Sequence, residues 1–133
     1  MHPHGEPAPL SIPPEQVQVV LLDGSWREAS AMAQEVKGWG RLVRLSHTGV
    51  SRYWLRSQAD TERFSTAETL IFLLRHFRLD HAAEALRLQL ELHVYASLRA
   101  RGHKEAAQAF LLESPIATAF APLIAQLDVR RPR

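Results

Sequence analysis

The residues best suited to chemistry in this chain stand together at Asp23, Gly24, Ser25 and Trp26. They follow an apolar run from Val17 to Leu22, which predicts a largely buried strand, and they precede a helical pattern. In open α/β sheets, loops diverge at the carboxyl ends of strands, and helix N-termini direct free N–H groups into the crevice. We therefore expect Asp23 in a ligand-binding crevice, where its carboxylate could take a proton, accept from a base edge or bind an amino group.

Two of these residues also have a structural interpretation. Ser25 and Glu28 have the S-x-x-E spacing of a capping box, in which the serine hydroxyl holds the first N–H groups of a helix. Trp26 could stack on a base beside the crevice, or it could be the first core residue of an amphipathic helix that ends near Gly38. The capping box gives no role to Asp23, two residues before the cap, and this favours a functional role for Asp23.

A second polar group, Ser65, Thr66 and Glu68, opens another predicted helix. Ser65 and Glu68 again have the capping-box spacing, and the apolar stripe that follows predicts a helix through about Phe77. Glu68 could cap this helix or bind an ammonium group, and one carboxylate cannot easily do both. Both interpretations of Glu68 remain open on the sequence alone.

The segment between these two groups is rich in arginine. From Arg41 to Arg78 there are seven arginines against three acids, although the net charge of the chain is only +2. Such a local excess favours a polyanion such as RNA, and a solvated arginine-rich surface is the structural alternative. Ser51 to Arg63 has no clear period and is predicted to be a surface loop, in which Arg56 could hold phosphate or carboxylate in a bidentate pair. The candidates for RNA contact are Arg52, Tyr53 and Arg63.

Few strands and many helices must position these residues. Arg41 to Ser46 alternates enough to predict a second strand, and a long helix is expected from about Asp80 to Ala100. Further helical segments span about Lys104 to Leu112 and open at Ser114-Pro115, the last of them broken or kinked at Pro122. We expect an α/β fold with a few-stranded, parallel sheet and a helix-rich C-terminal half.

Length and composition predict one domain, residues 15–133, after an extended or disordered leader in residues 1–14 that holds five of the eight prolines. The absence of cysteine excludes disulfides and cysteine-based zinc sites, and no metal site is predicted. No apolar run approaches the ~20 residues needed to cross a bilayer, so a cytoplasmic location is the default expectation. P-loop, G-x-G-x-x-G and H-E-x-x-H motifs do not occur, which removes the usual support for nucleotide hydrolysis, dinucleotide redox chemistry and zinc proteolysis.

Three blocks in order resemble the DTW-domain family, over roughly Val17 to Leu92. The first is Asp23-Gly24-Ser25-Trp26 with Ala29, where the family reads Asp-Gly-(Thr/Ser)-Trp-x-x-Ala. The second, Ser51 to Arg56, resembles Ser-x-Tyr-x-x-Arg, and the third, Phe64 to Thr69, resembles Ser-Thr-x-Glu-Ala with Thr69 in the last place. Members of the family usually carry a further N-terminal segment, often with a cysteine cluster of a zinc-binding type. The chain resembles a short form of the family without this segment.

The resemblance implies an S-adenosylmethionine-dependent transferase that moves the aminocarboxypropyl group onto a uridine in tRNA, with a fold related to the knotted α/β transferases. It implies that Asp23 removes the imide proton or aligns the base. The catalytic group would then be Asp23, Ser25 and Trp26. The cofactor-binding residues would be Gly24, Arg56, Ser65, Thr66 and Glu68.

Two alternatives stay open beside this transferase. One is a non-catalytic RNA-binding module, which keeps an RNA surface but has lost part of the cofactor site. This alternative is serious because a sheet of two strands is marginal alone. The other is a subunit that completes its sheet or site as a homo-oligomer through its apolar-striped helices. Calorimetric titration with S-adenosylmethionine would best separate a transferase from a binding module.

Overall fold

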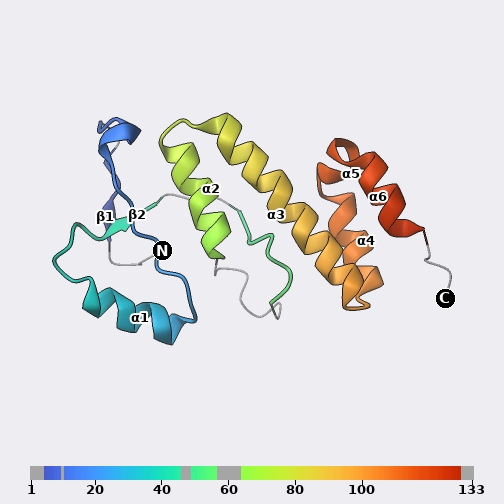
Figure 1. Ribbon diagram of the computed structural model, residues 1–133, viewed down its shortest axis with the longest axis horizontal. Coiled ribbons are helices and arrows are strands. Elements are labelled where there is room, and N and C mark those ends of the chain that lie inside the picture. Colours follow the sequence, from blue (N-terminus) through green and yellow to red (C-terminus); the bar gives the residue numbers. More distant parts are fainter. Residues whose placement is uncertain (1–4, 10, 46–48, 57–63, 130–133) are drawn as a thin grey trace.

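The computed structural model describes residues 5–9, 11–45, 49–56 and 64–129, and most of these residues are helical (Figure 1). The two strands are β1 (Glu6–Pro7) and β2 (Val43–Arg44), and a short 3-10 helix, η1, spans Pro14–Gln16. The α-helices are α1 (Trp26–Glu35), α2 (Thr66–His76), α3 (Asp80–Ala100), α4 (Lys104–Leu112), α5 (Ile116–Ala119) and α6 (Ala121–Asp128). None of the described helices is both long and apolar enough to span a membrane.

Capping boxes fix where α1 and α2 begin. The Ser25 hydroxyl accepts from the Glu28 N–H at 3.3 Å, and Glu28 Oε2 accepts from the Ser25 N–H at 2.7 Å. The Ser65 hydroxyl accepts from the Glu68 N–H at 3.2 Å, and Glu68 Oε2 accepts from the Ser65 N–H at 2.7 Å. Both predicted capping boxes are confirmed, because each pair satisfies N–H groups that have no partner inside the helix.

The predicted C-terminal helices are also confirmed, with α3 and α4 at the expected bounds. The last predicted helix is broken at Phe120 into α5 and α6, and Pro122 lies in the first turn of α6. A proline in the first turn removes an N–H that would have no helical partner, so it is compatible with a new start but not with a continuous helix.

The apolar core lies among the helices of the C-terminal half. Figure 1 shows α2 and α3 side by side, with α4 and α5 against the far part of α3 and α6 against α5. These helices present apolar residues at helical spacing, and their side chains meet in one cluster. The buried members of this cluster are Ile71, Ala83, Leu90, Val94, Tyr95, Leu98, Ala107, Phe110, Ile116 and Ile124.

The prediction of a buried strand from Val17 to Leu22 is wrong. Residues 17–22 form neither strand nor helix, and their side chains are exposed or half-buried. The strand β2 lies within the predicted Arg41–Ser46 segment, and it pairs in parallel with β1, with Glu6 opposite Val43. An apolar run becomes a strand only where another strand pairs with it, and here residues from the predicted leader make that pairing. The sheet is parallel, as predicted, but Asp23 does not follow one of its strands.

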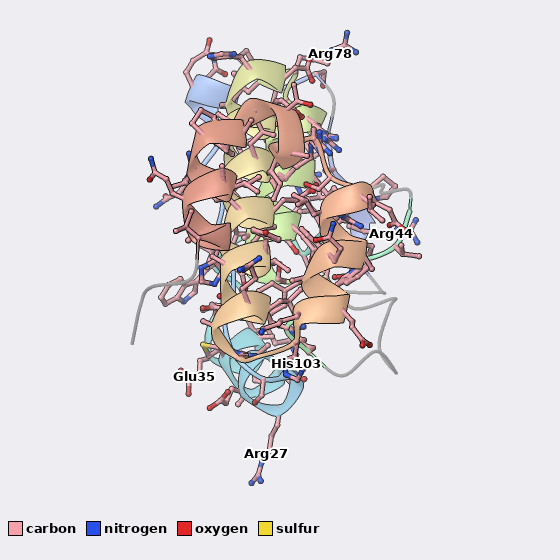
Figure 2. All side chains as sticks on the ribbon, turned by 90° about the vertical axis from the view of Figure 1, so that its right-hand side faces the viewer. Arg27, Glu35, Arg44, Arg78 and His103 are labelled. Atoms are coloured by element: carbon pink, nitrogen blue, oxygen red, sulfur yellow. The ribbon has the colours of Figure 1, made fainter. Side chains whose placement is uncertain are left out.

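Helix α1 lies apart from this core, beside the sheet (Figure 1). None of its described side chains is buried, and the apolar Ala29, Met32 and Ala33 are half-buried. In Figure 2, Arg27 on α1 projects away from the body of the molecule, at the same end as His103 in the turn between α3 and α4. The start of α1 is therefore held by specific contacts more than by a common core.

Candidate functional site

Asp23 is joined to the start of α2. The hydroxyl of Thr66, the first residue of that helix, donates to Asp23 Oδ1 at 2.5 Å, although 43 residues separate the two in the chain. The side chain of Asp23 is exposed, so its carboxylate can meet a solute from the solvent. The first and third sequence blocks therefore meet at the N-terminus of α2, and the expected crevice beside a strand is replaced by this junction.

The Glu68 carboxylate joins the second and third blocks. Its Oε1 accepts from the Arg52 backbone N–H at 2.6 Å and from the Ser51 hydroxyl at 3.0 Å. Its Oε2 accepts from the N–H and the hydroxyl of Ser65 at 2.7 and 2.9 Å. Only 4% of Glu68 is exposed, and a buried carboxylate needs such donors to offset its lost hydration. This geometry supports the capping interpretation of Glu68 and gives no support to its binding of an ammonium group.

The Arg52 side chain points into the protein. Its Nη1 donates to Glu113 Oε2 at 3.1 Å, and its Nη2 donates to the Phe110 carbonyl at 3.2 Å and to Glu91 Oε2 at 3.5 Å. The guanidinium carbon also lies 4.1 Å from the centre of the Phe110 ring. The predicted contact of Arg52 with RNA would require this guanidinium to leave its internal partners.

Arg56 ends the same segment and is exposed. Its guanidinium carbon lies 5.3 Å from the centre of the Tyr53 ring, and Tyr53 itself is half-buried against the core. The Leu55 carbonyl accepts from Arg101 Nη1 at 3.3 Å, which fixes the backbone beside Arg56. An exposed guanidinium on an anchored backbone is suited to a bidentate pair with a carboxylate or phosphate.

A shallow, open hollow lies next to Asp23 and is lined by Asp23, Gly24, Glu28, Ala31 and Met32. Gly24 has a φ of 156°, and a Cβ there would lie 3.1 Å from Glu28 Cβ and 3.2 Å from Glu28 Oε2, too close for an ordinary contact. Hydrogen bonding with the Ser25 side chain, and next with the Ser25 backbone, lowers the pKa of Glu28. Two carboxylates beside apolar Ala31 and Met32 suit a ligand that carries positive charge.

Two predicted site residues lie outside what the structure describes. Trp26 is the first residue of α1, but its side chain is not among the described ones. Arg63 falls in residues 57–63, outside the described chain, with the second half of the predicted surface loop. The other half, residues 51–55, is half-buried.

The described arginines between Arg41 and Arg78 have different surroundings. Arg41 Nη1 lies 3.9 Å from Glu6 Oε2, and Arg75 Nη2 lies 4.0 Å from Glu84 Oε2. The Arg52 side chain is directed inward and pairs with Glu113. In Figure 2, Arg78 lies at one end of the molecule and Arg44 lies away from that end. Three of these arginines therefore each lie next to an acid, and a positive patch formed by all seven stays a prediction.

The residues that accept hydrogen bonds from the Arg52 side chain were not predicted from the sequence. These are Glu91 on α3, Phe110 on α4 and Glu113 in the following turn, and the Ser114 hydroxyl donates to Glu91. One signal was present, because Glu91 is a charged residue next to Leu90 and three before Val94 on the apolar side of a long helix. Within the described residues there is no group of three or more side chains that could hold a metal ion.

Comparison with known proteins gives one clear match. No curated protein and no solved structure matches the chain. The sequence model of the DTW domain matches residues 2–98, which includes all three sequence blocks and also residues predicted to be a leader. Because this match covers more than half of the 133 residues and the blocks it contains meet in space, the chain belongs to the DTW domain family.

Proposed function

We propose that this protein transfers the aminocarboxypropyl group of S-adenosylmethionine to a uridine in tRNA. Membership of the DTW domain family supports a tRNA-modifying transferase. The observation that carries the proposal is the hydrogen bond from Thr66 to Asp23, which places an exposed carboxylate at the junction of the family blocks. A relation to the knotted α/β transferases and a cytoplasmic location are parts of the same proposal.

The residues around Asp23 fit the cofactor in charge and polarity. The amino acid end of S-adenosylmethionine carries an ammonium and a carboxylate, and its sulfur is positively charged. Asp23 and Glu28 at the hollow provide negative charge, Met32 and Ala31 provide apolar surface, and Gly24 leaves room for the Glu28 side chain. Arg56, on the anchored Ser51–Arg56 segment, is the candidate for the carboxylate. When bound, the cofactor supplies a carbon activated by a sulfonium leaving group.

Asp23 is the candidate base. As the uridine ring nitrogen forms its bond to carbon, the imide proton leaves that nitrogen, and the Asp23 carboxylate takes it. The bound cofactor would supply a neutral thioether as the leaving group, so charge would balance. Thr66 holds Asp23 Oδ1 at 2.5 Å, which fixes the carboxylate before the reaction. A positioned acid–base group of this kind contributes about 100-fold or more in rate.

An exposed arginine on α1 is the candidate for a tRNA phosphate. Arg27 projects from α1 into solvent (Figure 2). Arginine binds phosphate through two parallel N–H groups, and such contacts make affinity depend on salt. This contact would direct tRNA toward Asp23.

The test is a transfer assay with tRNA that lacks modified uridines. S-adenosylmethionine is labelled in one sample in the aminocarboxypropyl group and in another in the methyl group, and digested nucleosides are analysed by mass spectrometry. We expect the first label on uridine and the second in the sulfur-containing product. Label on uridine from the methyl group would overturn the proposal, and Asp23→Asn serves as the low-activity control.

The RNA-binding module remains the second candidate, and one observation favours it. The hollow beside Asp23 is shallow and open, and no described side chain of α1 is buried. Binding of tRNA with no calorimetric response to S-adenosylmethionine would support this module. A site completed by a homo-oligomer instead predicts that transfer rises more steeply than protein concentration as subunits associate.

A further inference from the structure

We propose that Arg52 is a positioning residue that couples the helices after the family match to the segment carrying Arg56. The inference rests on the proposed function, in which Arg56 holds the cofactor's carboxylate. Arg52 is four residues before Arg56, in the second block, and its partners include residues of α4 and the turn to α5. These helices lie beyond residue 98, where the family match ends.

Arg52 has several partners, and their geometry suits a planar side-chain group. Its two terminal nitrogens reach Glu113 at 3.1 Å, the Phe110 carbonyl at 3.2 Å and Glu91 at 3.5 Å. Its plane also lies near the Phe110 ring, with 4.1 Å from guanidinium carbon to ring centre. A planar guanidinium can donate in several directions while it contacts an aromatic ring, and a lysine ammonium cannot reproduce both.

The partners of Arg52 are themselves held by other residues. Glu91 is 1% exposed, and it also accepts from the Ser114 hydroxyl and from Arg87 Nη1, the latter at 3.3 Å. Ser114 is 7% exposed, and its oxygen accepts from the Ile116 N–H at 3.3 Å. Phe110 is fully buried in the core cluster. Arg52 therefore attaches to a rigid part of the protein.

The backbone between Arg52 and Arg56 is held at several points. The Arg52 N–H is held by Glu68 at 2.6 Å, and the Arg52 carbonyl accepts from the Trp54 N–H at 3.0 Å. Trp54 lies edge-on to Phe110 with 5.1 Å between ring centres. The Leu55 carbonyl is held by Arg101 on the far side. Loss of the Arg52 side-chain contacts should therefore displace Trp54 and Arg56 together.

The experiment compares Arg52→Lys with Glu113→Gln, each measured for transfer rate, tRNA affinity and S-adenosylmethionine affinity. Arg52→Lys keeps a positive charge for RNA but loses the planar contacts. We expect kcat/KM for the cofactor to fall about tenfold while the Kd for tRNA changes by less than about twofold. If Arg52 instead contacts phosphate, Lys keeps most of the activity, and the positioning role is refuted.

Glu113→Gln distinguishes a positioning role of Arg52 from a phosphate contact, because the first predicts slower transfer and the second predicts tighter tRNA binding. This variant remains informative if Arg52→Lys does not fold. The Glu113 side chain is 67% exposed, so its replacement should leave the fold intact. Positioning predicts a loss of about threefold in kcat/KM, whereas an RNA contact predicts tighter tRNA binding because an acid that competes for Arg52 is gone. Glu105→Gln, which replaces an exposed acid on α4, the helix that ends just before Glu113, is the control with the same change in charge.

A readout without catalysis separates this inference from the proposed function. With 5-fluorotryptophan in place of tryptophan, the Trp54 ¹⁹F resonance, assigned with Trp54→Phe, should move in Arg52→Lys and Glu113→Gln but not in Glu105→Gln. An unmoved resonance in both variants would overturn the positioning role. If the unmutated protein transfers nothing, the proposed function fails, and the ¹⁹F shift still decides whether Arg52 positions the segment.

Discussion

The Thr66 hydroxyl donates to the Asp23 carboxylate across 43 residues of sequence, with 2.5 Å between the two oxygens. Thr66 is at the start of a helix packed on the core, whereas Asp23 precedes a helix that is not. The bond therefore attaches the Asp23 carboxylate to the stable part of the protein. A carboxylate held by one oxygen and exposed to solvent is oriented without being withdrawn from a substrate.

Replacement of Asp23 by asparagine tests its role as a base. The amide preserves size and can still accept from Thr66, but it cannot take a proton. Because Asp23 is exposed, stability should change little, tRNA should still bind, and transfer should slow by at least ~100-fold. Full activity in a stable Asp23→Asn protein, measured by single-turnover transfer, would show that Asp23 is not the base.

Thr66→Val tests whether the hydrogen bond to Asp23 matters for orientation. Valine has the shape of threonine but no donor, so Asp23 keeps its charge and loses its support. We expect kcat to fall about tenfold with the Kd for tRNA unchanged, and Thr66→Ser, which restores a hydroxyl, to recover most of the rate. Equal rates for the valine and serine variants would show that the bond has no part in transfer.

The two capping serines should differ in their effect on stability. Ser25 is exposed, whereas Ser65 is 7% exposed and its hydroxyl also donates to Glu68, which holds Ser51 and Arg52. We expect Ser25→Ala to lower the free energy of unfolding by about 0.5–1 kcal/mol and Ser65→Ala by about 1–2 kcal/mol. Urea denaturation followed by circular dichroism measures both. A larger loss at Ser25 would contradict this order, and Ser25→Asp should keep the cap.

The cap of α1 should weaken in acid. Hydrogen bonding with Ser25 lowers the pKa of Glu28 in the folded protein. Its contribution is therefore complete above the unfolded glutamate pKa and is lost as pH falls through the lower folded value. We expect the acid loss of α1 helicity, followed by NMR between about pH 6 and pH 2, to be smaller in Glu28→Gln, which caps without titrating. Identical acid profiles would show that Glu28 does not stabilise α1 through its charge.

Affinity for tRNA should depend on salt through Arg27. Arg27→Ala should weaken binding and make the slope of log K against log salt shallower by about one. Arg78 is the matched control, since it lies at the opposite end of the molecule from Arg27 (Figure 2). Its φ is 60°, so Arg78→Asn removes the charge without backbone cost. A salt slope that is the same in Arg27→Ala and Arg78→Asn would show that Arg27 does not contact phosphate.

The sequence by itself determined the local features of this protein. The S-x-x-E spacing at Ser25 and Ser65 fixed the starts of two helices, because a cap needs contacts only three residues apart. Apolar periodicity gave α3 and α4 their bounds, and Pro122 gave the break before α6. The same local blocks carried the family resemblance, and the family match confirmed it.

Tertiary structure decided every feature that depends on distant residues. Only the fold chose Glu6–Pro7 over Val17–Leu22 as the partner of β2, because pairing needs a neighbouring strand and not apolarity alone. Only the fold directed Arg52 to the Phe110 carbonyl, 58 residues away, and Thr66 to Asp23. A side chain's charge is visible in the sequence, but its partner is set by the packing of whole helices, and that packing determines which arginines and carboxylates remain available for a ligand.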